Sequence, residues 1–161
     1  MSGLNRRRLL AATAAFVTTA VSPALAQATT FRTVAVDVRP LRAKGLGDHA
    51  DAVGAALQRE LAAAFVDRIA AGGPKLVVRI DAISMRDYVG GDNRLFGSGS
   101  PNDYLEGEAL IIGSRGEVLR RHPQLSAVPA SSGGAWYSHG SEERRLGALA
   151  QHYAGWLRRA L

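Results

Sequence analysis

The residues best suited to chemistry lie close together near the end of the chain. Ser138, His139 and Glu142 are the residue types of a hydrolase triad, in which a base activates a serine nucleophile and a carboxylate orients the base. Neighbours in sequence rarely reach this geometry, however, and the chain has no Gly-x-Ser-x-Gly elbow. A catalytic role for His139 is therefore an alternative here, and we expect no enzymatic activity.

Aromatic residues beside the pair Gly133–Gly134 suggest either a pocket or a packed corner. Aromatics next to glycines, just before a helix, can line a small-molecule site. They can equally close one end of the hydrophobic core, because large rings are unfavourable in water and glycine permits close backbone approach. We favour the packed corner. The candidate binding residues are the two neighbouring aromatics and the histidine here, with two aromatics upstream: Trp136, Tyr137, His139, Tyr88 and Phe96.

Two carboxylates, Glu106 and Glu108, share one face of an expected strand over residues 103–113, about 7 Å apart. Such a pair can bind a cation or perform acid–base chemistry. More commonly, it forms the solvent face of an antiparallel strand and is opposed by arginines such as Arg120. We adopt the second interpretation and expect no metal site.

The glycine-rich stretch from Arg86 to Asn102 contains neither a Gly-x-Gly-x-x-Gly nor a Walker pattern, and no helical pattern follows it. We therefore expect a long loop rather than a nucleotide site, and no cofactor. The chain has no cysteine, which excludes disulfides, thiolate metal ligands and a lipid-modified cysteine.

The first 26 residues have the pattern of a cleavable export signal. Arg6, Arg7 and Arg8 precede an apolar core over residues 9–20, and Ala24-Leu25-Ala26 offers a small-x-small cleavage site. The arginine pair resembles a twin-arginine signal, although Asn5 and Leu9 depart from that pattern, and a Sec signal is the alternative. We expect a periplasmic protein that begins near Gln27, forms a single domain over residues 27–161 and has no transmembrane segment.

Composition excludes a nucleic-acid partner. The formal net charge of +6 includes the three leader arginines, which leaves +3 for the rest of the chain. After the leader, no basic run exceeds two residues, so the electrostatic footprint of a nucleic-acid-binding protein is missing.

The elements that position these residues centre on residues 48–85. Val53, Leu57, Leu61, Phe65 and Ile69 recur every four residues, which predicts a helix capped by Asp48 and ended by Gly72, Gly73 and Pro74. A strand over residues 78–82 follows directly. Before them, Val34, Val36 and Val38 predict a strand stopped by Pro40, parallel to the next one, with a linker over residues 42–47.

The second half of the chain predicts a hairpin and a helix. Residues 103–113 and 118–122 form its two strands around a turn at Gly116, and Pro123 ends the second. An irregular segment then leads to a helix over residues 141–161, capped by Ser141. Its expected apolar stripe includes Leu146, Leu149, Tyr153, Trp156 and Leu157.

The order β-α-β-β-β-α predicts an α/β (α+β) two-layer sandwich, a mixed sheet with two helices on one face. In order and size, it resembles small periplasmic accessory proteins of the outer membrane, such as the lipopolysaccharide-assembly partner protein and the N-terminal domain of the Tol-system propeller protein. The resemblance is one of topology, without a shared motif, and it implies an accessory role in the envelope.

These observations predict a non-catalytic periplasmic accessory or binding protein. Its loops over residues 87–102 and 133–139 would contact an unknown protein or another envelope component. One alternative is a small hydrolase or cation-dependent enzyme that uses His139. Another is an envelope-surface binder, which would need Arg144, Arg145, Arg158 and Arg159 to cluster on one exposed patch.

Overall fold

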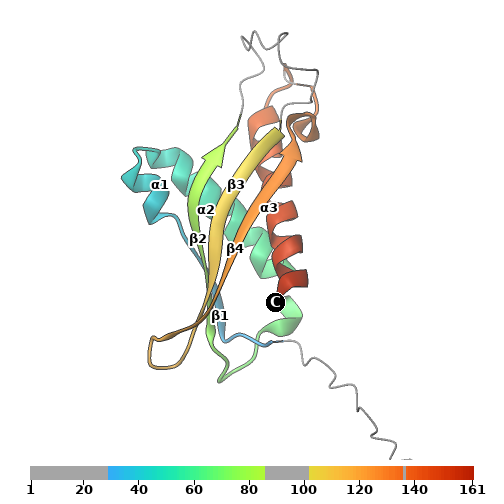
Figure 1. Cartoon of the computed structure of the whole chain (residues 1–161). Helices are drawn as coiled ribbons and strands as arrows, with labels where there is room; N and C mark the ends of the chain where they lie inside the picture. The colour runs from blue at the N-terminus through green and yellow to red at the C-terminus, as the bar shows by residue number, and fades with distance from the viewer. Residues whose placement is uncertain (1–28, 86–101, 136) are drawn as a thin grey trace, which may run out of the picture.

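Four strands form one mixed sheet, and two long helices cover one of its faces (Figure 1). The computed structural model describes residues 29–85, 102–135 and 137–161. In chain order, the elements are β1 (Thr33–Asp37), α1 (Arg39–Ala43), α2 (Gly47–Ala64), the 3-10 turn η1 (Val66–Arg68), β2 (Lys75–Ser84), β3 (Asn102–Ile112), β4 (Val118–Pro129), the 3-10 turn η2 (Ala130–Gly133) and α3 (Ser141–Ala160). The expected two-layer fold class is confirmed, with α1 as an additional short helix.

The strands lie in the order β1-β2-β3-β4. As predicted, β1 pairs with β2 in parallel, and the helix between them crosses over one face. β2 with β3, and β3 with β4, are antiparallel. A shift in register between Ile80 and Ala82 leaves Asp81 as a bulge in β2.

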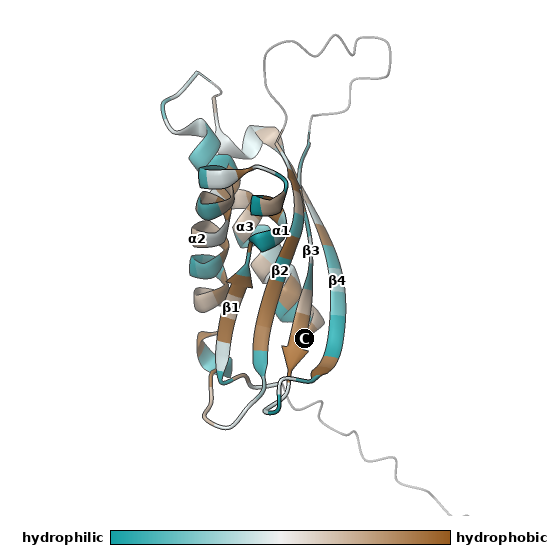
Figure 2. Ribbon diagram, turned by 90° about the vertical axis from the view of Figure 1, so that its left-hand side faces the viewer, coloured by the Kyte–Doolittle hydropathy of each residue, from teal (hydrophilic) through white to brown (hydrophobic). Residues whose placement is uncertain are grey.

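Alternation along the strands separates the core from the uncovered face. The residues that face the helices are buried, and hydropathy marks β2 as mainly apolar and the middle of β4 as polar (Figure 2). The core combines Leu76, Val78, Ile80, Leu105, Ala109 and Ile111 from the sheet with Val53, Leu57 and Leu61 from α2 and Leu149, Tyr153 and Leu157 from α3.

Helix α2 is shorter than the four-residue apolar spacing predicts. It ends at Ala64, where Phe65 leaves the helical conformation and packs edge-on against Phe31, with ring centroids 5.8 Å apart. Ile69 then pairs with Phe31 in a parallel bridge instead of continuing the apolar stripe. The prediction that the helix continues to Gly72 is wrong, because pairing with the chain before β1 outcompetes one more helical turn.

Other expected boundaries are also wrong. Pro123 does not end β4, since an edge strand has a neighbour on one side only and tolerates a residue without an N–H. Residues 39–43 form α1 with Pro40 in its first turn, where proline fits a helix. The N-cap residues of α2 and α3 are Leu46 and Gly140, and not the expected Asp48 and Ser141.

Trp156 was expected in the apolar stripe of α3, but it is 52% exposed. Its indole Nε1 donates a hydrogen bond to His152 Nε2 at 2.9 Å, and the guanidinium of Arg159 stacks 4.3 Å from its ring. The ring is therefore held on the surface by polar contacts of its own helix. Within the described ranges, no helix is long and apolar enough to cross a membrane.

Candidate functional site

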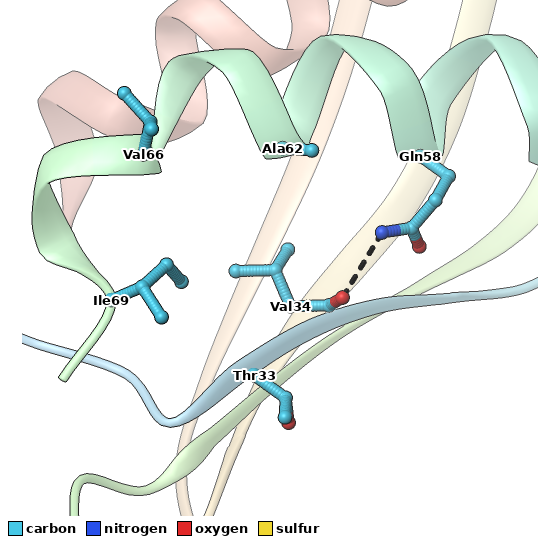
Figure 3. A pocket seen from close by; sticks show the side chains of 6 residues that line it. All are labelled: Thr33, Val34, Gln58, Ala62, Val66 and Ile69. Atoms are coloured by element: carbon cyan, nitrogen blue, oxygen red, sulfur yellow. Dashed lines mark hydrogen bonds between the residues drawn. The ribbon is translucent and has the colours of Figure 1, made fainter. Parts of the chain in front are cut away.

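An apolar groove lies between the edge strand β1 and the C-terminal half of α2 (Figure 3). Its volume is about 490 Å³. The lining residues are all uncharged: Thr33, Val34, Gln58, Ala62, Val66 and Ile69. Val66 is 72% exposed and Ile69 is 48% exposed, so two branched apolar side chains face solvent at one side of the groove. Water contact with such side chains is unfavourable, and a ligand that covers them would gain binding free energy.

The end of α2 creates this groove. Arg68 O accepts a hydrogen bond from Phe31 N at 2.7 Å, and Phe31 O accepts one from Ala70 N at 2.9 Å. These two bonds hold η1 and the residues after it against the chain just before β1. Phe65 is thereby directed into the core, whereas Val66 remains on the surface beside the groove.

A side-chain hydrogen bond joins the two sides of the groove. Gln58 Nε2 donates to Val34 O at 3.1 Å, which links the middle of α2 to β1 (Figure 3). Both residues line the groove.

The two edges of the sheet differ in how they are protected. β4 carries Arg120 and Arg121 next to Pro123 and ends at Pro129, and charged side chains and prolines are devices that discourage a further strand. β1 has the sequence Thr-Val-Ala-Val-Asp, with no proline and no basic residue. Among the described residues, the Phe31–Ile69 bridge is the pairing on the outer side of this region.

Three basic residues lie next to lining residues in sequence or register, but they are not among the residues that line the groove. Arg32 precedes Thr33, Lys75 lies opposite Thr33 in the ladder, and Arg68 precedes Ile69. Lys75 alternates with the buried Leu76, so its side chain lies on the uncovered face of the sheet. The guanidinium of Arg68 lies 5.8 Å from the centroid of the Phe65 ring.

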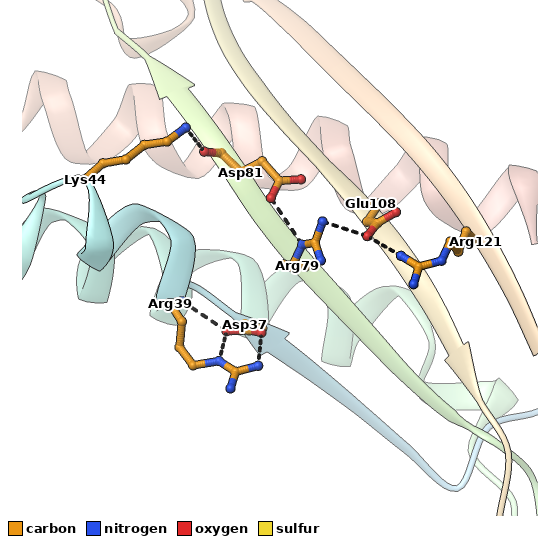
Figure 4. Close-up of polar contacts among 7 residues, drawn as sticks. All are labelled: Asp37, Arg39, Lys44, Arg79, Asp81, Glu108 and Arg121. Carbon is orange, nitrogen blue, oxygen red and sulfur yellow. Dashed lines mark hydrogen bonds and ion pairs between the residues drawn. The ribbon is translucent and has the colours of Figure 1, made fainter. Parts of the chain in front are cut away.

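The uncovered face of the sheet carries a row of ion pairs instead of a site (Figure 4). Glu108 pairs with Arg79 at 2.8 Å and with Arg121 at 2.9 Å, and Arg79 also contacts Asp81 at 3.2 Å. The expected pairing of a carboxylate with arginine across the hairpin is confirmed, but the partner is Arg121 and not Arg120. No group of acidic and histidine side chains that could hold a metal ion occurs among the described residues.

Asp37 forms a separate ion pair with Arg39 at the end of β1 (Figure 4). It accepts hydrogen bonds from Arg39 Nη2 at 2.6 Å, Arg39 Nε at 2.9 Å and Arg39 N at 3.0 Å. The side-chain hydrogen bond from Arg39 lowers the pKa of Asp37, and the backbone bond and the positive charge act in the same direction against burial. Lys44 Nζ donates to Asp81 O at 2.7 Å. These contacts tie the two ends of α1 to β1 and β2.

The segment before α3 lies apart from the groove's lining. Tyr137 is 79% exposed, and His139 is exposed. Arg144 holds the segment at both ends, because its Nε donates to Gly133 O and its Nη1 donates to His139 O, each at 2.8 Å. Among the described residues, no carboxylate lies within ion-pair distance of the His139 ring, and this geometry does not support the alternative in which His139 is catalytic. Trp136, Tyr88 and Phe96 lie outside the described residues.

The arginines of α3 do not form one exposed patch. Arg145 is buried against Asp103, and Arg144 binds the backbone of the preceding segment. Arg158 pairs with Asp67 at the opposite end of the helix, about 20 Å along its axis, and Arg159 stacks on Trp156. The arrangement required by the arginine-mediated alternative is therefore not present.

None of the groove residues was among the candidate binding residues. Ile69 was assigned to the core stripe of a longer helix, and Val66 and Ala62 carry no signal by type. Ile69 was the one available signal, because it is the last residue of the apolar stripe and lies close to the predicted end of the helix at Gly72-Gly73-Pro74.

Comparison with known proteins yields no family. No family model and no curated protein matches the chain. Two solved structures are similar in part. One is a candidate lipoprotein from Caulobacter crescentus CB15, with 16% identity, 81% of this chain and 85% of that chain covered, and a TM-score of 0.43. The other is a minor lipoprotein from Acinetobacter baumannii, with 13% identity, 82% and 88% covered, and a TM-score of 0.33. At these TM-scores, neither likeness indicates what this chain does.

Proposed function

We propose that this chain is an exported, non-catalytic binding protein of the cell envelope, and that it holds its partner in the groove between β1 and α2. The observation that carries this proposal is the groove itself. It has a volume of about 490 Å³, an uncharged lining and two exposed branched side chains. The groove is open to solvent, and its volume falls within the range of known ligand sites.

The export signal supports the location. Three arginines, an apolar core and an Ala-x-Ala sequence precede the first described residues, which is the pattern of a leader that directs a protein out of the cytoplasm. We place the partner in the groove of the folded body, and contacts through the loops over residues 87–102 and 133–139 stay a prediction.

Site-specific photo-crosslinking in cells tests the proposal. A photo-reactive benzoylphenylalanine replaces Ala62, which lines the groove, or Ala63, which is its exposed neighbour on α2 outside the lining. We expect an adduct in the periplasmic fraction from position 62 and none from position 63. N-terminal sequencing of the same fraction should give a start near Gln27. Equal adducts at both positions, or a protein retained with Met1 in the cytoplasm, would contradict the proposal.

A further inference from the structure

We propose that the turn between β3 and β4, together with the strand ends that carry it, docks on the surface of an anionic lipid bilayer. We call this surface the hairpin tip, and it comprises residues 112–121 with the adjacent Lys75 of β2. Its cations would meet lipid phosphates, and its exposed aliphatic side chains would enter the interfacial layer. This inference goes beyond the proposed function, because no residue of the hairpin tip lines the groove.

Two exposed aliphatic side chains lie where β4 leaves the turn. Val118 is 43% exposed, and the adjacent Leu119 is 58% exposed. Leu119 is the extra residue at a shift in register, between the pairs that Ile111 and Ile112 make. A bulge of this kind leaves the extra residue outside the regular pairing. Both side chains are in contact with water in the isolated protein, and their transfer to a less polar layer is favourable.

Cations lie on both faces of the hairpin beside these aliphatic side chains. Arg121 is on the uncovered face of the sheet, where it pairs with Glu108 at 2.9 Å. Lys75 is on the same face, at the end of β2 that adjoins the hairpin. Arg120 projects to the opposite face, because consecutive strand residues alternate in direction. Arg115 is exposed in the turn itself.

The hairpin tip has more positive than negative charge. Glu117 is the acidic residue within it, and its Oε2 accepts a hydrogen bond from the backbone N of Arg115 at 3.0 Å. Among the described residues, no acidic side chain lies within ion-pair distance of Arg115, Arg120 or Lys75. Basic side chains near an anionic leaflet are attracted to it, and each contributes to binding.

The placement of these charges favours a bilayer over a protein partner. The turn projects from the lower end of the molecule, away from α3 (Figure 1). A protein laid on one face of the sheet would reach either Arg120 or Arg121. An extended anionic layer that meets the turn end-on would reach the cations of both faces and the aliphatic pair together. Basic residues combined with exposed aliphatic residues are typical of segments that lie in a membrane interface.

Sedimentation with lipid vesicles tests the inference. One set of vesicles contains phosphatidylglycerol and phosphatidylcholine in equal parts, and the other contains phosphatidylcholine alone. The protein is used as cells produce it, and any leader that remains is common to all variants. We expect at least about tenfold tighter binding to the anionic vesicles at low salt, and a loss of this preference at high salt, where charges are screened.

Two pairs of variants locate the contact. Arg120→Gln removes a cation of the hairpin tip, and its control Arg59→Gln removes an exposed cation of α2. Leu119→Ser and its control Leu125→Ser remove leucines of β4 that are 58% and 64% exposed, but Leu125 lies about 20 Å farther from the turn. We expect vesicle binding to weaken about fivefold for Arg120→Gln and about tenfold for Leu119→Ser, and less than about twofold for each control.

An attached dye reports which part of the protein enters the bilayer. The chain has no cysteine, so Leu119→Cys and Leu125→Cys each supply a single attachment site for an environment-sensitive fluorophore. We expect the emission of the dye at position 119 to shift to the blue with anionic vesicles. The dye at position 125 should keep its emission in water.

No sedimentation with the anionic vesicles would overturn the inference, as would equal effects of each variant and its control. Equal shifts of the two dyes would place the contact on another surface and contradict it as well. Binding to soluble polyglutamate without binding to vesicles would assign the hairpin tip to an acidic protein. The crosslink at position 62 tests the proposed function separately, because that position lies in the groove.

Discussion

Arg145 in the first turns of α3 and Asp103 at the start of β3 form a buried ion pair. Arg145 Nε donates to Asp103 Oδ2 at 2.8 Å and Nη2 donates to Oδ1, with both side chains almost fully shielded from water. This bidentate contact joins α3 to the sheet at the end where β3 begins. Its loss would leave a guanidinium without its carboxylate in the interior.

Asp103→Asn should therefore destabilise the fold strongly. Removal of one partner from a buried pair costs about 3–5 kcal/mol, because the remaining charge stays desolvated. Asp51→Asn is the control, since Asp51 pairs with Arg42 on the surface and exposed pairs contribute about 0–1 kcal/mol. Urea denaturation of both variants measures the difference. Similar midpoints for the two would show that the buried pair contributes no more than a surface pair.

Gly133→Ala should destabilise the protein, because the backbone at Gly133 packs closely against the first turns of α3. A Cβ at this position would lie 2.6 Å from Ser141 O, and it would also meet the side chain of Arg145. Backbone cannot move away as a flexible side chain can, so we expect a loss of about 1–3 kcal/mol. Ser132→Ala is the matched control on the exposed neighbour, and its thermal midpoint should remain that of the wild type. A Gly133→Ala protein as stable as the control would mean that this corner of the fold is loosely packed.

Phe65→Ala should show whether the end of α2 is anchored as described. Phe65 is fully buried against Phe31, and truncation of a buried phenylalanine costs about 3–5 kcal/mol. The adjacent Val66→Ala should change stability by less than about 0.5 kcal/mol, because Val66 is exposed. Chemical denaturation measures the free energy of unfolding of both variants. Equal losses would show that Phe65 does not point into the core while Val66 points to solvent.

The contact between Asp67 and Arg158 should contribute stability that depends on pH. Hydrogen bonds from Arg158 lower the pKa of Asp67 from 3.8 to about 2. Because the folded pKa lies below the unfolded one, this contribution is present above about pH 4 and is lost as the pH falls towards 2. Thermal melts of Asp67→Asn should therefore differ from wild type at pH 6 and converge with it near pH 2. Arg158→Gln should behave in the same way, and a difference that stays constant with pH would contradict the assignment.

Much of the fold is determined by local patterns in the sequence. The alternation of Val34 and Val36, the spacing of Val53, Leu57 and Leu61, and the alternation in residues 103–112 predict the strands, the helix and the buried faces that the structure contains. These features depend on periodicity within one element, and burial of one face follows from it. The parallel pairing of β1 and β2 also follows, since a helix between two neighbouring strands requires a crossover.

Boundaries and the groove were decided by contacts between residues far apart in the chain. Ile69 fits the helical spacing, but its pairing with Phe31, 38 positions earlier, is what ends α2 and exposes Val66. Pro123 lacks an N–H and is therefore expected to end a strand. It lies within β4 because β4 is an edge strand of the sheet. The partner of Asp103 lies 42 residues away. A single sequence shows which residues can hydrogen-bond or pack, whereas the choice among distant partners depends on the free energy of the assembled sheet and helices.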